Sequence, residues 1–94
     1  MSKRNIRRIE LDCPIRYHAI GSDDIHEGRA CDYSNSGVSF IARDKLEEGQ
    51  LQEIHIDNPG EQMPPLHAII EVIRCKPAEK PGEFFIAGFI KILK

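Results

Sequence analysis

Residues 9–19 read IELDCPIRYHA, with an apolar side chain at every odd position and mostly polar side chains between them. A period of two is that of a β-strand with one buried face. Pro14 lies on the polar side of this pattern and has no N–H to give to a sheet ladder. The strand is therefore expected either to run along an edge at this point or to carry a bulge there.

Shorter stretches of the same kind follow along the chain. Residues 38–42 and 51–56 predict two further strands, and residues 25–32 predict another that Gly28 interrupts. Between them, residues 44–49 are expected to form at most one helical turn that stops at a glycine.

Two long apolar runs lie in the second half of the chain. Residues 66–75 and 83–93 are rich in β-branched and aromatic side chains on both faces. Apolar character on both faces predicts central strands that are buried on both sides.

About six strands and no long helical pattern favour an all-β fold, a small six-stranded antiparallel barrel with little or no C-terminal helix. The 94 residues have room for one domain, spanning residues 1–94. Hydrophobic residues make up 40% and charged residues 30%, which is typical of a folded globular chain.

Charge is unevenly distributed. The formal net charge of −2 argues against a general binder of DNA or RNA. Even so, four of the 13 basic residues fall within the first eight positions, before the first acid at Glu10. The expectation is a flexible arginine-rich arm, residues 1–8, ahead of a barrel formed by residues 9–94.

The sequence also predicts the cellular location of the protein and the redox state of its cysteines. It has no apolar run of about 20 residues and no signal peptide pattern, so a cytoplasmic protein with no membrane insertion is expected. Cys13, Cys31 and Cys75 form no C-x-x-C pair and are expected to be reduced thiols.

Two polar patches carry side chains suited to a nucleotide. Arginines before the first strand offer planar donors that can take a phosphate or the O6/N7 edge of guanine. Asp32 can accept hydrogen bonds from the N1–H and N2–H of guanine. Gly37, at the end of the second patch, would let the backbone approach the ligand or adopt a positive φ.

The combination of these patches resembles the PilZ domain family. R-x-x-x-R is formed by Arg4 and Arg8, and D-x-S-x-x-G by Asp32, Ser34 and Gly37. The resemblance covers nearly the whole chain and is supported by residues 38–40, 46–49 and 88–90. It implies a six-stranded antiparallel barrel.

The resemblance also implies a ligand, the bacterial second messenger cyclic di-GMP. Arg4 and Arg8 would hold guanine and phosphate, Arg7 would make a weaker phosphate contact, and Asp32, Ser34 and Gly37 would hold a guanine. The arm would become ordered on binding and relay the signal to a protein partner, for which a second copy of the chain is one candidate. Motility, polysaccharide secretion and biofilm formation are the processes that the family suggests.

Three other functions compete with this one. An enzyme or a zinc site is disfavoured, because the cysteines and histidines show neither C-x(2–4)-C nor H-x(3–5)-H spacing, and no metal or cofactor is expected. A single-stranded nucleic-acid binder would need more aromatic residues and a basic groove. The alternative that stays open is a PilZ-fold protein-interaction adaptor that binds no nucleotide.

Overall fold

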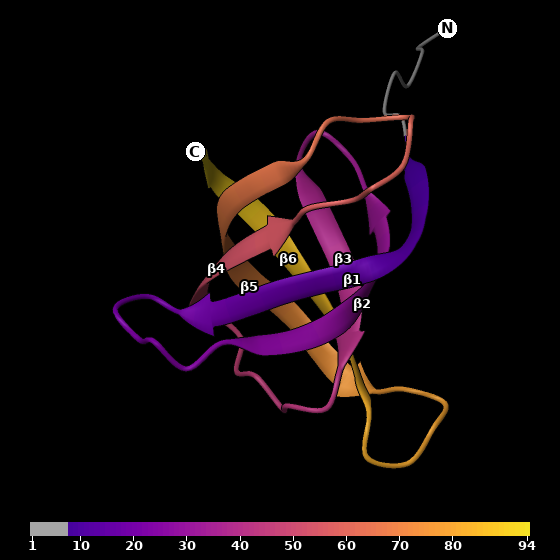
Figure 1. Ribbon diagram of the computed structural model, residues 1–94. Coiled ribbons are helices and arrows are strands. Elements are labelled where there is room, and N and C mark those ends of the chain that lie inside the picture. The colour runs from indigo at the N-terminus through magenta and orange to yellow at the C-terminus, as the bar shows by residue number, and fades with distance from the viewer. Residues whose placement is uncertain (1–7) are drawn as a thin grey trace, which may run out of the picture.

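The computed structural model describes residues 8–94 (Figure 1). Six strands make up the fold: β1 (Ile9–Ala19), β2 (His26–Tyr33), β3 (Gly37–Ala42), β4 (Leu51–Ile56), β5 (Leu66–Pro77) and β6 (Phe84–Leu93). The expected bounds of the first and fourth strands agree with the structure, and those of the others differ by one or two residues. None of the described residues forms a helix that could cross a membrane.

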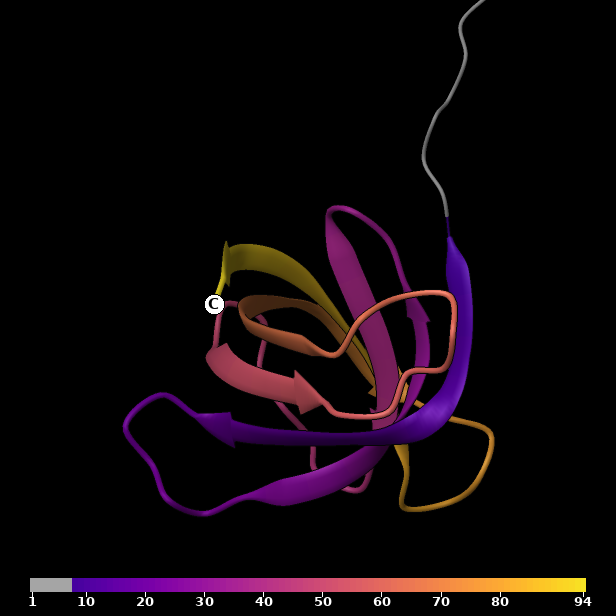
Figure 2. The same cartoon turned by 45° about the horizontal axis from the view of Figure 1, so that its top comes forward.

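The strands close into a barrel in the order β1-β2-β3-β6-β5-β4, and every neighbouring pair is antiparallel (Figures 1 and 2). The six-stranded antiparallel barrel predicted from the sequence is therefore confirmed. Closure matters for a chain of this size, because it leaves few strand edges with unpaired backbone groups.

The irregularity expected at Pro14 is present in β1. This strand pairs with β4 only from Arg16 to Ala19, so Pro14 lies where β2 alone is hydrogen-bonded to the strand. The β1–β2 register also shifts between Glu10 and Cys13, next to the proline. β1 thus combines a local edge with a bulge.

The inward positions of the strands form one apolar core. The largest fully buried side chains are Tyr17, Phe40, Ile15, Ile54, Ile56, Ile70, Ile86 and Val72. The ring centroids of Tyr17 and Phe40 lie 5.1 Å apart. The Tyr17 hydroxyl donates a hydrogen bond of 2.5 Å to Asp44, which supplies the partner that a buried tyrosine needs.

The prediction that β5 and β6 are buried on both faces is wrong. Both strands have neighbours on either side, but a barrel has a single interior, and their outward side chains face solvent. Ile73 is 55% exposed, Phe89 44% and Ile92 52%. Apolar residues on both faces indicate here a barrel with exposed apolar side chains on its outer face, not a sheet covered by a second layer.

No helical turn forms between β3 and β4. Instead, the Gly49 N–H donates to the Val72 carbonyl at 2.7 Å, and the Val72 N–H donates to the Gln50 carbonyl at 2.9 Å. These bonds extend the β4–β5 ladder. They engage the Gly49 N–H and the Gln50 carbonyl, which are then not available to a helical turn. Gly49 has a φ of 91°, a left-handed conformation that glycine adopts readily.

Candidate functional site

Arg8, the last residue of the first motif, lies beside the second motif at one corner of the barrel, because β1 begins directly after it. Ile9 pairs with Tyr33 in the antiparallel β1–β2 ladder, so the residue before β1 lies beside the end of β2. Arg8 accordingly places Nη2 3.7 Å from Oδ2 of Asp32. The arginine side chain is 69% exposed and the aspartate 28%, so the pair opens to solvent.

Asp32 is held from the other side by Ser39 on β3. The Ser39 hydroxyl donates a hydrogen bond of 2.9 Å to Oδ1 of Asp32, and Ser39 itself is only 5% exposed. One carboxylate oxygen is therefore engaged by the barrel, while the other faces Arg8. Sequence reasoning missed Ser39, although its place two residues after the glycine of the motif was a usable signal, because that register sets it opposite Asp32.

Irregular pairing surrounds Asp32 on both sides. The β2–β3 register shifts between Ala30 and Asp32, and the β1–β2 register shifts between Glu10 and Cys13. Bulges re-aim side chains and are frequent next to binding sites. Here the two bulges flank Asp32, whose carboxylate lies between the buried hydroxyl of Ser39 and the exposed guanidinium of Arg8.

The turn after β2 completes the corner. Its closure comes from the Ser34 N–H, which donates to the Gly37 carbonyl at 2.8 Å, and the Ile90 N–H ties the turn to β6 through the Ser36 carbonyl at 2.8 Å. A Cβ on Gly37 would lie 2.7 Å from the carbonyl oxygen of Gly88. The glycine is thus required by a close approach of two strands, and the alternative of a positive φ is wrong.

Of the six predicted site residues, Arg8, Asp32, Ser34 and Gly37 lie together at this corner, whereas Arg4 and Arg7 fall outside the described residues. A cationic fork beside an oriented carboxylate can bind a planar group that has an acceptor edge and a donor edge, such as guanine. A hollow of about 950 Å³ lies elsewhere, at the opposite end of β2 and β3, and none of these residues lines it. The predicted site is therefore an open corner of the surface.

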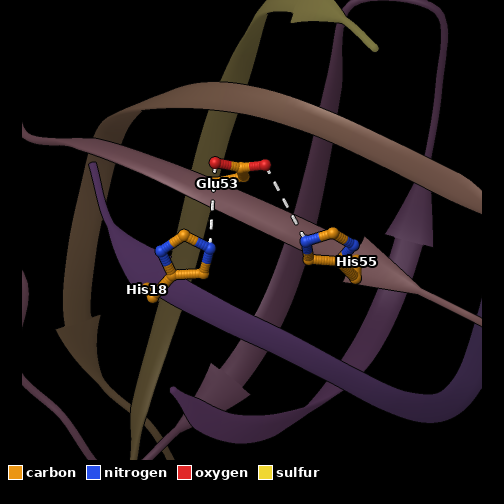
Figure 3. Close-up of side chains that lie close together, drawn as sticks. All are labelled: His18, Glu53 and His55. Atoms are coloured by element: carbon orange, nitrogen blue, oxygen red, sulfur yellow. Dashed lines mark ion pairs between the residues drawn. The ribbon is translucent and has the colours of Figure 1, made fainter. Parts of the chain in front are cut away.

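A second group of polar side chains lies on the outer face of the barrel (Figure 3). His18 of β1 and Glu53 and His55 of β4 bring ligand-type atoms within 4.8 Å of one another. The expectation of no metal site rested on the spacing of cysteines and histidines that are close together in the sequence. His18 and Glu53 are 35 positions apart, so no local motif contains both. Only the register of β1 against β4 brings them together.

Comparisons with known proteins agree on the fold. The chain is similar to the Bacillus subtilis inhibitor of motility (MotI/DgrA), with a TM-score of 0.77 and 12% identity, over 100% of this chain and 45% of that one. It is also similar to the PilZ domain of YcgR from Escherichia coli, solved with c-di-GMP, with a TM-score of 0.64 and 12% identity, over 95% of this chain and 78% of that one.

The sequence comparisons are more specific. No curated protein matches the chain. The PilZ domain family, by contrast, matches residues 2–89, which include both motifs and all strands except the last part of β6. The chain therefore belongs to the PilZ domain family.

Proposed function

We propose that this chain is a cyclic di-GMP receptor that binds the dinucleotide at the corner formed by Arg8, Asp32, Ser34 and Gly37. The observation that carries the proposal is the 3.7 Å approach of Arg8 to Asp32, because it joins the end of one motif to the start of the other. The solved YcgR domain with c-di-GMP supports the choice of ligand by family resemblance.

The chemistry of the corner suits a guanine base. Asp32 offers an acceptor for the N1–H and N2–H donors of guanine, and Ser39 fixes its orientation. Arg8 is largely exposed, so its guanidinium is free to turn from Asp32 toward a phosphate or the O6/N7 edge of a base. Binding requires no bond to be made or broken, and the proposed role is that of a receptor without catalysis.

The proposal extends to signal relay. Arg4 and Arg7 enter it through the family motif, and residues 1–8 would close over the bound dinucleotide. The surface changed in this way would be read by a protein partner, since binding coupled to ordering of a segment is an established way to present a new surface.

The test is a calorimetric titration of the protein with cyclic di-GMP, beside the variant Arg8→Ala. Loss of a charge-assisted contact should weaken binding by about 1.5–3 kcal/mol, which is at least about tenfold in affinity. Arg74→Ala is the matched control, because it removes an exposed arginine on β5 and should leave the affinity unchanged. GTP and cyclic di-AMP test whether the site reads a cyclic guanine dinucleotide.

Each outcome decides between the two candidate functions. Saturable binding that is lost in Arg8→Ala and kept in Arg74→Ala supports the receptor. Equal affinities in both variants would remove Arg8 from the site. An absence of heat at high micromolar cyclic di-GMP would favour a protein-interaction adaptor built on the same barrel.

A further inference from the structure

Three neighbouring strands place histidines and one glutamate on the same patch of the outer surface. In the β1–β4 ladder His18 lies opposite Glu53, and in the β4–β5 ladder His55 lies opposite His67. Their side chains are neither free in solvent nor fully enclosed, with exposures of 15% for His18, 22% for Glu53 and 25% for His55. A patch with this degree of shelter limits the motion of its side chains while leaving a path for a small ion.

Glu53 lies between two imidazole nitrogens, as Figure 3 shows. Nε2 of His18 is 3.8 Å from one carboxylate oxygen, and Nε2 of His55 is 3.9 Å from the other. In a tetrahedral zinc site with bonds of about 2.0–2.1 Å, neighbouring ligand atoms are about 3.3 Å apart. The ligand atoms of the three side chains lie within 4.8 Å of one another, so they would need to move together by up to about 1.5 Å to hold such an ion.

The second ring nitrogen of His18 is engaged in a way that leaves Nε2 as a ligand. Nδ1 lies 3.0 Å from the carbonyl oxygen of Ala19, which only accepts hydrogen bonds, so Nδ1 carries the proton. In the neutral ring the lone pair of Nε2 then points toward a carboxylate oxygen of Glu53. A cation between the two atoms would convert this repulsive contact into an attractive one, and a backbone carbonyl on the other nitrogen is a usual outer partner of a metal-bound histidine.

His67 orients the carboxylate from the far side. Its Nε2 lies 2.5 Å from Oε2 of Glu53, and its ring stacks on that of His55 with centroids 4.0 Å apart. A carboxylate held by a neighbouring imidazole is fixed in orientation, with its other oxygen turned toward His18.

We propose that His18, Glu53 and His55 form a binding site for a zinc-like divalent cation on the outer face of the barrel, with His67 as the residue that orients Glu53. Two imidazoles and one carboxylate favour zinc or a neighbouring transition metal over calcium or magnesium, which prefer oxygen ligands. Three protein ligands leave the fourth position of a tetrahedral ion open to water.

Zinc titration by calorimetry tests this site, in the untagged protein carrying Cys31→Ser and Cys75→Ser. These two substitutions remove the half-buried thiols, which would otherwise compete for the metal. Cobalt is the second probe, because bound Co²⁺ reports its coordination through visible absorption. The variants are His55→Gln and Glu53→Gln, and the matched control is His26→Gln, whose two ring nitrogens face separate carboxylates, Asp24 and Asp44.

We expect saturable zinc binding in the parent protein and in His26→Gln, and affinities at least about 100-fold lower in His55→Gln and Glu53→Gln. His67→Gln should weaken binding by about tenfold to 100-fold, as loss of an outer partner of a metal ligand does. Circular dichroism verifies that each variant keeps its strands, and Glu53→Gln, being nearly isosteric, gives a second reading if His55→Gln unfolds. The proposal is overturned if the parent shows no zinc binding below millimolar concentration, which would leave the histidines to bind protons alone, or if the variants bind as tightly as the control.

Discussion

The two ends of β1 carry two different kinds of polar cluster. Arg8, immediately before the strand, faces Asp32 across a gap of 3.7 Å, and His18, near its end, faces Glu53 across 3.8 Å. The first pair comes from two motifs that are each compact in sequence. The second pair exists only because β4 returns alongside β1 in a set register. Both pairs depend on strand pairing, but only the residues of the first belong to motifs that can be recognised in the sequence.

The clusters also differ in how firmly the barrel holds them. Arg8 is 69% exposed and has the freedom to change partners, as a ligand contact requires. His18 is 15% exposed and is hydrogen-bonded through its other nitrogen to the backbone. An exposed cluster is suited to a large ligand that replaces its contacts, and a sheltered one to a single ion.

The largest effect is expected when the variant of each cluster is titrated with both ligands, cyclic di-GMP and zinc. Arg8→Ala should lose at least about tenfold in cyclic di-GMP affinity and keep its zinc affinity, whereas His55→Gln should do the reverse, because contacts without shared partners act independently. Both titrations on both variants measure this. A loss of both ligands in either variant would show that the two ends of β1 are coupled through the strand.

A smaller effect is expected from Gly37→Ala, which acts through the backbone on the corner that holds Arg8 and Asp32. The new Cβ would lie 2.7 Å from the Gly88 carbonyl oxygen, so β3 and β6 must move apart. We expect a loss of about 1–3 kcal/mol in the free energy of unfolding, measured by urea denaturation. Ser36→Ala, in the same turn, should stay within about 0.5 kcal/mol of the parent. Equal stability of the two variants would contradict the close approach of β3 to β6.

The smallest effect is expected from Ser39→Ala, which removes the hydrogen bond that orients Asp32. The free energy of unfolding should fall by about 0.5–1.5 kcal/mol, and the affinity for cyclic di-GMP should fall severalfold while the zinc affinity does not change. Ser22→Ala, in the turn after β1, is the control. A full loss of cyclic di-GMP binding would mean that Ser39 touches the ligand and does not act through Asp32.

Much of the fold could be predicted because its strands repeat every second residue. The period-two pattern gave β1 its bounds, and the interruption at Gly28 did not prevent β2 from forming, since Ala30 packs in the core. The pattern could not distinguish a strand buried on two faces from one with an exposed apolar side, and so the outer face of β5 and β6 was predicted wrongly. That distinction depends on whether a second layer covers the sheet, which no single strand encodes.

The candidate sites, like the fold, could be predicted from the sequence only in part. Arg8 and Asp32 could be grouped in advance because the two motifs together resemble those of the PilZ family, and their role in binding a nucleotide stays a prediction. Glu53 and the histidines could not be grouped, because their proximity depends on the register between strands. A shift of one residue in the β1–β4 ladder would turn His18 away from Glu53.

Pro14 has a consequence for how this barrel avoids other chains. Over residues 9–15 the side of β1 away from β2 has no hydrogen-bonded strand among the described residues, since pairing with β4 begins at Arg16. Such a margin is a template on which a strand of another molecule could add and begin aggregation. Pro14 removes a donor from the middle of the margin, and the neighbouring bulge twists it, so an added strand would find an interrupted ladder. The proline that interrupts β1 thereby makes this margin a poor template for strand addition by another chain.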